Sequence, residues 1–280
     1  MGQSWSHIDN NQIDNNGLLM SDKYIPEEVI SQILIQYVDY KSLVNCQVVC
    51  KHWNNLIQDY IWRRKSELIV GQSLCLITDM SWIVYYQICH KKPFNRNLIK
   101  NYSGKDNLDD WLFICQGREG WTVEKPPISG VLEIPKEAQF DDKQCCFVTA
   151  SHNSVKRQVI HLDNTGLSSE FFDNYHPLIE IGEWYTCSTD RPANYKCSVR
   201  LLGERNKTLD TFFFNGTISE EKKCTWQHVS FEFKNYGPGL RKIFFQHGGR
   251  DKFGLNGSKM AGASITINVH YDHLLSSMTN

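Results

Sequence analysis

The spacing of apolar residues changes along the chain, and this change constrains the fold most. Between residues 25 and 62, apolar side chains recur every three or four positions, as they do on one face of an α-helix. After about residue 128 they alternate with polar side chains, which is the period of a half-buried β-strand. The chain is therefore expected to hold a helical part followed by a β-rich part.

The helical part is expected to contain three short helices. Pro26 suits a first-turn position, and Glu27 and Glu28 favour the positive end of a helix of about three turns, which Asp39 or Tyr40 ends. A unit this small has little room for a core, so we expect its apolar surface to need a partner. The apolar positions of the three helices are Val29, Ile30, Ile33, Leu34, Tyr37 and Val38; Leu43, Val44 and Val48; and Val49, Trp53, Leu56, Ile57 and Tyr60.

The β-rich part is predicted to be an antiparallel β-sandwich, because many short alternating runs follow one another without intervening helices. The runs are Val159 and His161 (with Gln158 and Ile160 opposite), Tyr195, Cys197, Val199 and Leu201, then Val229, Phe231 and Phe233, and finally Ala263, Ile265, Ile267 and Val269. Turns are expected between them at residues 163–166, 190–194, 237–239 and 248–249.

The predicted fold class is thus α+β and multidomain, and the boundaries follow from composition. Residues 1–23 form a polar flexible leader, 24–64 the three-helix unit, 65–91 a helical linker, 92–270 the sandwich and 271–280 a polar tail. The apolar stretch 68–89 could also be a membrane span. Asp79 lies at its middle, and a charge there is costly in lipid, which favours the linker.

Charge and cysteine usage exclude several classes of function. Thirty basic and 31 acidic residues give a net charge of −1, which disfavours nucleic-acid binding. The ten cysteines form no CxxC pair, and the chain begins with polar residues rather than a signal sequence. Reduced thiols and a cytoplasmic location are expected.

Several cysteines and histidines resemble catalytic or metal-binding residues. Cys50 and His52 resemble a thiol and a base, but neighbouring residues on a helix point apart, so Cys50 is interpreted as structural. Cys145 and Cys146 must face opposite sides of a strand, and no histidines have the spacing of metal ligands. We expect no enzyme activity, no metal and no cofactor.

The helical part resembles an F-box over almost its full length. The ordered set consists of Ile25-Pro26-Glu27-Glu28-Val29-Ile30, Ile33-Leu34, Leu43, Val48-Val49-Cys50-Lys51-His52-Trp53, Leu56-Ile57 and Trp62. This resemblance implies docking onto the small adaptor subunit of an SCF-type cullin-RING ubiquitin ligase, and through it onto the cullin. An apolar surface should form the contact. The predicted adaptor-binding residues are Pro26, Val29, Leu34, Leu43, Val49 and Trp53.

The β-rich part resembles the F-box-associated domain of the sugar-recognising F-box proteins, from about Pro93 to Val269. Its motifs here are Arg96-Asn97-Leu98-Ile99-Lys100-Asn101, Gly120-Trp121-Thr122-Val123-Glu124, Cys146-Phe147-Val148-Thr149, Arg157-Gln158-Val159-Ile160, Trp184-Tyr185, Val199-Arg200-Leu201-Leu202, Tyr236-Gly237-Pro238-Gly239 and Gln246-His247-Gly248-Gly249-Arg250-Asp251. Most are expected to be structural, with glycines at positive φ and Trp and Arg side chains tying loops to strands. The resemblance implies a β-sandwich. In sugar-binding members, loops at one end take the inner core of N-linked glycans, so that retrotranslocated misfolded glycoproteins are ubiquitinated.

The candidate residues for binding a target or glycan are Asp190, Lys252 and Phe253. A sugar site needs an aromatic face and groups that bond to hydroxyls. Residues 252–257 hold one aromatic residue where a sugar-binding member should have a Tyr-Trp-like pair, which favours a lost or altered sugar site. Asp190 either binds a hydroxyl or caps a turn before Arg191, and Phe253 either stacks on a sugar or closes the end of the sandwich.

The predicted function is that of a non-catalytic substrate receptor of a ubiquitin ligase, which holds its target near the ubiquitin-charged enzyme. The alternative is a lectin-like or protein-binding module acting outside the ligase. The target is a polypeptide or an N-glycoprotein, and the sequence leaves both open.

The first six residues, Met1-Gly2-Gln3-Ser4-Trp5-Ser6, fit the pattern for N-myristoylation of Gly2. The alternative is an unmodified leader. One acyl chain without a polybasic patch binds membranes only marginally, so a mixed cytosolic and weakly membrane-associated population is expected if Gly2 is acylated.

Overall fold

The computed structural model describes residues 17–20, 23–74, 80–115, 118–125, 131–136, 144–149, 153–187, 193–219, 221, 224–251 and 257–269. The chain divides into two compact units, Met1–Leu74 and Cys75–Asn280. The boundaries of the leader, linker and tail stay predictions. Among the described helices, none is both long and apolar enough to cross a membrane.

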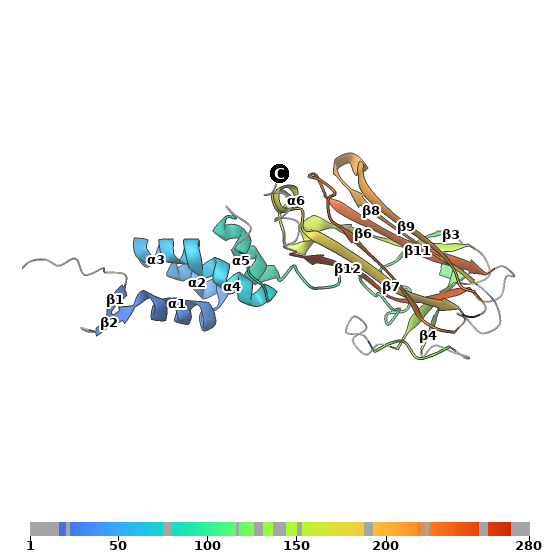
Figure 1. Ribbon diagram of the computed structural model, residues 1–280, viewed down its shortest axis with the longest axis horizontal. Coiled ribbons are helices and arrows are strands. Elements are labelled where there is room, and N and C mark those ends of the chain that lie inside the picture. Colours follow the sequence, from blue (N-terminus) through green and yellow to red (C-terminus); the bar gives the residue numbers. More distant parts are fainter. Residues whose placement is uncertain are drawn as a thin grey trace, which may run out of the picture. The chain divides into compact units, whose positions relative to one another are not determined.

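The first unit contains the predicted helices (Figure 1). They are α1 (Glu27–Gln36), α2 (Tyr40–Cys46), α3 (Lys51–Leu56) and α4 (Trp62–Val70), with a π-helical turn (Ile57–Ile61) joining α3 to α4. Strand β1 (Gly17–Met20), in the segment assigned to the leader, pairs antiparallel with β2 (Lys23–Pro26).

Local chemistry explains where these helices start and end. The Asp39 side chain accepts bonds from the backbone N–H groups of Lys41 and Ser42, at 2.9 and 3.1 Å, and so caps the start of α2. Cys50 Sγ accepts from Trp53 N at 3.5 Å at the start of α3. Gly71 ends α4 in the left-handed region, with φ of 79°.

The core of this unit is small and apolar, with one buried polar tie. Its members are Ile30, Leu34, Leu43, Ile57, Ile61 and Trp62. The Trp62 indole Nε1 donates to Gln47 Oε1 at 3.3 Å, which satisfies the indole inside the core.

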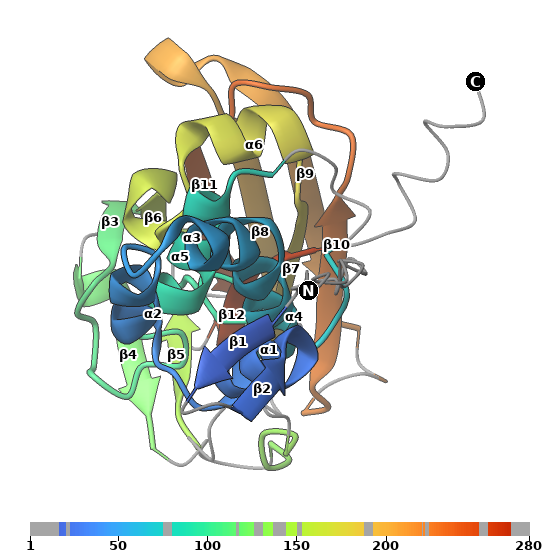
Figure 2. The same cartoon turned by 90° about the vertical axis from the view of Figure 1, so that its left-hand side faces the viewer.

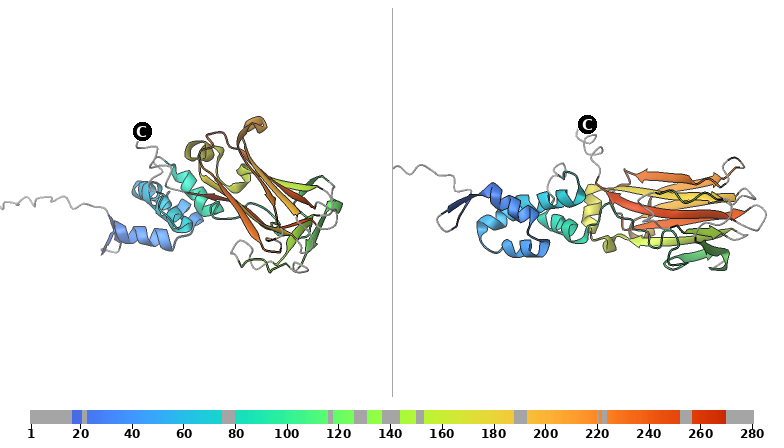
Figure 3. Two further views of the ribbon diagram at one scale, coloured as in Figure 1. Left: turned by 45° about the vertical axis from the view of Figure 1, so that its right-hand side comes forward. Right: turned by 90° about the horizontal axis from the view of Figure 1, so that it is seen from below.

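The second unit begins with α5 (Trp82–Lys91), within the stretch predicted as a helical linker. The sandwich that follows has two five-stranded antiparallel sheets, in the orders β10-β7-β12-β5-β4 and β3-β6-β11-β8-β9 (Figures 1 and 3). The strands of the first sheet are β10 (Gln227–Phe233), β7 (Leu178–Cys187), β12 (Ser258–Asn268), β5 (Cys146–Thr149) and β4 (Trp121–Glu124). Those of the second are β3 (Leu112–Cys115), β6 (Ser154–His161), β11 (Lys242–Asp251), β8 (Ala193–Leu202) and β9 (Thr208–Thr217).

Helix α6 (Ser169–Tyr175) lies at one end of the sandwich (Figures 1 and 2). Asp173 on this helix bonds to both terminal nitrogens of Arg241, each at 2.8 Å, and accepts from Gly239 N at 2.7 Å. Gly237 and Gly239 have φ of 72° and 96°, as expected for glycines in a turn. This motif therefore fixes a turn to a helix, as predicted for most of the family motifs.

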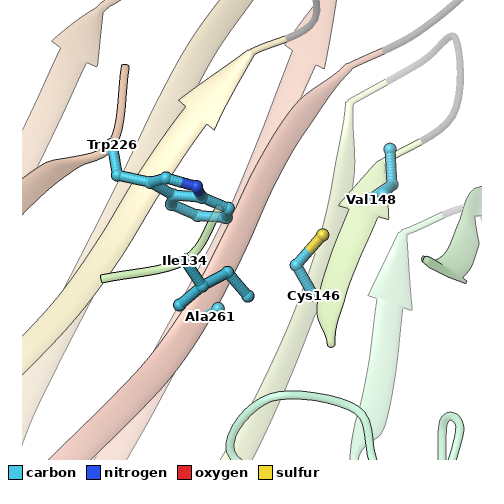
Figure 4. Close-up of a cluster of buried hydrophobic side chains, with 5 residues drawn as sticks. All are labelled: Ile134, Cys146, Val148, Trp226 and Ala261. Atoms are coloured by element: carbon cyan, nitrogen blue, oxygen red, sulfur yellow. The ribbon is translucent and has the colours of Figure 1, made fainter. Parts of the chain in front are cut away.

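Alternation places one face of each strand in the core. Tyr195, Cys197, Val199 and Leu201 are buried, as predicted, and so are Ile265 and Ile267. A separate apolar cluster lies on the other face of the first sheet, where Trp226 and Ile134 pack with Ala261, Cys146 and Val148 (Figure 4).

Three details of the strand prediction were wrong. On β6, Val159 and His161 are exposed, and Gln158 on the opposite face is buried. Gly248 and Gly249 lie inside β11 and not in a turn. A Cβ at Gly248 would collide with the Ser154 carbonyl, so close approach of β6 explains this glycine. Phe231, from the run predicted in β10, is exposed and stacks on Phe212, with ring centroids 4.6 Å apart.

The edge of β12 is completed by a segment without regular structure, residues 95–103. Leu98 N donates to the Ile265 carbonyl at 2.8 Å. The Asn97 side chain donates to the Ala263 carbonyl at 2.9 Å and accepts from Ile265 N at 3.1 Å. A register shift between Ala261 and Ser264 marks where this segment meets the strand.

Candidate functional site

The first unit carries an exposed apolar surface, which we call the apolar face. On α1, Val29 and Ile33 are exposed by 47% and 48%, and Tyr37 follows four positions later at 79%. Residues four apart share one side of a helix, so these three form a stripe. The other members, from α2 and the turn after it, are Val44, Val48 and Val49. This much uncovered apolar surface on so small a unit suits contact with a protein partner.

The six predicted adaptor-binding residues do not share one environment. Pro26, Val29 and Val49 are exposed, and Trp53 is partly buried. Leu34 and Leu43 are buried in the core, because they lie on the sides of α1 and α2 that pack inward. The structure thus places these two leucines in the folding of the unit rather than on its surface.

The sandwich interior holds a buried polar cluster, formed by Lys156, Glu183, Tyr195 and His247. Lys156 and His247 are cross-strand partners on β6 and β11, and both point inward by the alternation of their strands. Glu183 Oε1 lies 2.5 Å from His247 Nδ1, and the Tyr195 hydroxyl donates to Glu183 Oε2. Four polar side chains between two sheets are unusual, because each loses its water on burial.

Aromatic rings surround the cationic side of this cluster. The His247 ring stacks on Trp111, with centroids 4.5 Å apart, and Lys156 Nζ lies 4.3 Å from the Trp111 centroid and 4.6 Å from that of Trp121. Burial lowers the pKa of Lys156, against the attraction of Glu183, and lowers the pKa of His247 in the same way. Burial also raises the pKa of Tyr195.

Members of this cluster line none of four cavities found among the described residues. A perturbed pKa marks a functional site only where a ligand can reach the group. We therefore interpret the cluster as part of the folded core.

The outer face of the β10-β7-β12 sheet carries a groove of about 1020 Å³, which we call the polar groove. Its floor is Gly182, which faces Ser230 on β10 and Ser264 on β12. A Cβ on Gly182 would lie 3.0 Å from His228 Nε2 and 3.1 Å from Ser264 Oγ, so both side chains converge above it.

Charged and hydroxyl groups line the rest of the polar groove. Glu180 and Thr266 are cross-strand partners beside Gly182, and Glu232 and Lys234 form an ion pair of 2.7 Å at the β10 side. Asn97 and Tyr102 contribute from the segment that completes β12. Such a set of donors and acceptors suits a ligand rich in hydroxyl groups.

The sequence-predicted ligand residues Asp190, Lys252 and Phe253 lie outside the described residues, as does Gly2. The polar groove was missed from the sequence. Its residues are polar positions of three strands that become neighbours only through the pairing of β7 with β10 and β12. The polar half of the alternation was the available signal, but it does not reveal which strands pair.

The two units match two family models. The F-box associated region matches residues 89–267, and the F-box-like model matches residues 23–67. The chain therefore belongs to the F-box proteins that carry an F-box associated region, which confirms the resemblance found in the sequence.

More particularly, the chain is similar to several F-box only proteins. It is 30% identical to F-box only protein 44 of Homo sapiens over 258 residues, covering 87% of this chain and 95% of that protein. It is 31% identical to F-box only protein 6 of Mus musculus over 251 residues, covering 87% and 82%. With F-box only protein 2 of Bos taurus it shares 26% identity over 252 residues, covering 87% and 82%.

Proposed function

We propose that this protein is a non-catalytic substrate receptor of an SCF-type ubiquitin ligase. The observation that carries the proposal is the apolar face on a unit that belongs to the F-box family. The adaptor subunit covers this face and links the chain to the cullin, while the sandwich holds the target. The receptor then acts by proximity, because a held target meets the charged enzyme at a high effective concentration.

Substitutions on the apolar face test adaptor binding. Ile33→Asp and Val49→Asp each place a charge on the contact surface and are expected to weaken adaptor binding by at least tenfold, since a buried anchor contributes about 2 kcal/mol or more. Leu68→Asp is the matched control, because Leu68 is exposed on α4 outside the apolar face. Affinity is measured by calorimetry with the full chain and purified adaptor.

Circular dichroism of each variant shows whether the unit is still folded. Substituting Leu34 would not give a clean test, since Leu34 is in the core. Adaptor affinity that is unchanged in both apolar-face variants would contradict the proposal.

We further propose that the target carries an N-linked glycan, although the single aromatic residue in 252–257 favours an altered sugar site at the loops. Two observations support this: the family to which the sandwich belongs, and the hydroxyl-binding character of the polar groove. Asp190, Lys252 and Phe253 stay the predicted ligand residues at the loops, and the polar groove is a second surface for the same chemistry.

A glycan array probed with the full chain in complex with its adaptor tests this point. Binding to core N-glycans that Phe253→Ala abolishes assigns recognition to the loops, while loss in Glu180→Gln assigns it to the polar groove. Glu133→Gln, which removes an exposed carboxylate elsewhere, should bind like the unchanged chain. An array without binding, together with co-purification of a non-glycosylated target, would contradict glycan recognition.

The alternative is a lectin-like or protein-binding module that acts outside the ligase. It would leave the apolar face without a partner. A chain that binds its ligand but is not retained by the adaptor would establish this alternative.

For location, we propose a cytoplasmic protein with a membrane-associated fraction through myristoylated Gly2. Intact mass of the N-terminal peptide from a eukaryotic host shows the modification, and Gly2→Ala should make the protein fully soluble. Unmodified or acetylated Gly2 in all molecules would contradict the lipid.

A further inference from the structure

The outer face of the second sheet carries a cationic cavity, separate from the polar groove. Its volume is about 360 Å³. Three neighbouring strands each supply one cation: Arg157 from β6, Arg200 from β8 and Lys242 from β11. Val159, Leu202 and Phe244 form its apolar part.

The register of the strands explains why these residues meet. Phe244 on β11 lies directly opposite Arg200 on β8 and Val159 on β6. Lys242 lies opposite Leu202. All these positions are on the same face by strand alternation, so the cavity is built on rigid sheet rather than on loops.

Phe244 holds the two guanidinium groups in place. The central carbon of Arg200 lies 4.3 Å from the ring centroid, and that of Arg157 lies 5.1 Å from it. A guanidinium stacked on a ring keeps its planar fork of donors oriented, which lowers the entropy lost when it binds a ligand.

Among the described residues, no acidic side chain forms an ion pair with the cations of this cavity. Within the described chain, neither Arg157 nor Arg200 has a carboxylate within ion-pair distance, and Arg157 Nε is shielded from solvent with no hydrogen-bond partner. Lys242 Nζ reaches the neutral Asn206 Oδ1 at 3.4 Å. The carboxylate of Glu204, which is close to Asn206 in the chain, lies 3.8 Å from Arg241. Arg241 also pairs with Asp173.

We propose that this cavity is a binding site for a phosphate group, carried by a protein or free in solution. Like charges gathered on one rigid surface repel each other until an anion occupies the space between them. Forked guanidinium groups together with a lysine match the oxygens of a phosphate, and two negative charges on the ligand complement three positive ones. The site goes beyond the proposed function and is independent of glycan recognition in the polar groove.

Two probes test the site on the full chain: inorganic phosphate and a short peptide with one phosphoserine, each titrated by calorimetry at low salt. Arg200→Gln is expected to weaken binding of both at least tenfold, and Arg157→Gln with Arg200→Gln to abolish it. Arg200→Lys keeps the positive charge but loses the forked donors, so its affinity should lie between that of the unchanged chain and that of Arg200→Gln. Lys196→Gln is the matched control, since it removes a cation from the same face of β8 outside the cavity.

Thermal unfolding and adaptor binding of each variant report whether both units are intact. Tighter binding of the phosphopeptide than of phosphate identifies a protein-borne phosphate as the ligand, and equal binding identifies the free anion. The proposal is overturned if the double variant binds both probes like the unchanged chain. It is equally overturned if neither probe binds the unchanged chain at millimolar concentration, or if Lys196→Gln loses as much affinity as Arg200→Gln.

Discussion

At the scale of single residues, Lys156 and His247 show how a sandwich can hold titratable groups inside. Glu183 is the acidic member and receives bonds from two sides, whereas Lys156 is in contact mainly with aromatic rings. Removing the partner of a buried polar group lowers stability more than replacing the polar group itself with a well-packed apolar side chain. The residues of this cluster should therefore respond differently to substitution.

Lys156→Met should leave stability unchanged or raise it by about 1 kcal/mol. The substitution keeps most of the length of the side chain and removes the cost of burying an amino group whose Nζ has no hydrogen-bond partner in the described structure. The free energy of unfolding from urea titration measures the effect. A loss of about 3 kcal/mol or more would instead show that Lys156 compensates the charge of Glu183.

His247 should make the sandwich less stable in acid. Burial lowers the pKa of His247 below its ordinary value of 6.5, so the unfolded chain takes up a proton that the folded chain refuses. Stability is therefore full above about pH 6.5 and falls as the pH drops below it, by at most about 1.4 kcal/mol per pH unit for this group.

His247→Asn keeps a donor near the position of Nδ1, toward Glu183, but does not titrate, so the stability of this variant should fall less steeply between about pH 7 and pH 5. Urea unfolding at a series of pH values compares the two slopes. Equal slopes would exclude His247 as the source.

The sequence predicted the buried apolar positions of β8 and β12 but not this cluster. Alternation states which residues share a face of a strand, and His247 follows Ile243 and Phe245 at inward positions of β11. Lys156 is different, because no apolar pattern in β6 marks its side as the inner one. Only the pairing of Lys156 with His247 across the strands places both inside.

At the scale of elements, strand β12 depends on the neighbouring segment 95–103 for several of its hydrogen bonds. Asn97→Ala removes the acceptor for Ile265 N and the donor to Ala263 O. Leaving such groups unsatisfied costs about 1 to 3 kcal/mol each, so the sandwich should lose roughly 2 to 6 kcal/mol. Urea unfolding followed by near-ultraviolet circular dichroism measures the loss, with Lys100→Ala, which shortens an exposed side chain, as a control in the same segment. Equal losses in both variants would contradict a specific role for the Asn97 side chain.

The three helices of the first unit were predicted correctly because caps and apolar spacing are local signals. Asp39 is such a signal, since its side chain bonds to backbone two and three residues further on. The segment 95–103 gives no comparable signal, because its partner β12 lies more than 150 residues away. The candidate sites differ in the same way. The apolar positions of the F-box could be predicted from local spacing, whereas the polar groove and the cationic cavity depend on which strands pair and could not be predicted.

At the scale of the whole molecule, the chain has two units with separate cores. Leu43→Ala should lower only the stability of the first unit, by about 2 to 4 kcal/mol, because it leaves a cavity in the small F-box core. Asn97→Ala should lower only that of the second. Differential scanning calorimetry of both variants is expected to show one shifted and one unshifted transition in each case. A shift of both transitions in either variant would contradict separate cores.

The segment that completes β12 also limits where this chain can be shortened. A fragment that began after residue 103 would keep every described strand of both sheets yet leave the backbone N–H and C=O groups of Ala263 and Ile265 without partners. An open strand edge of this kind recruits the same edge of another molecule, and such fragments tend to polymerise. A soluble recombinant sandwich must therefore begin before Asn95, and self-association of shorter fragments would reflect the cut rather than a native oligomer.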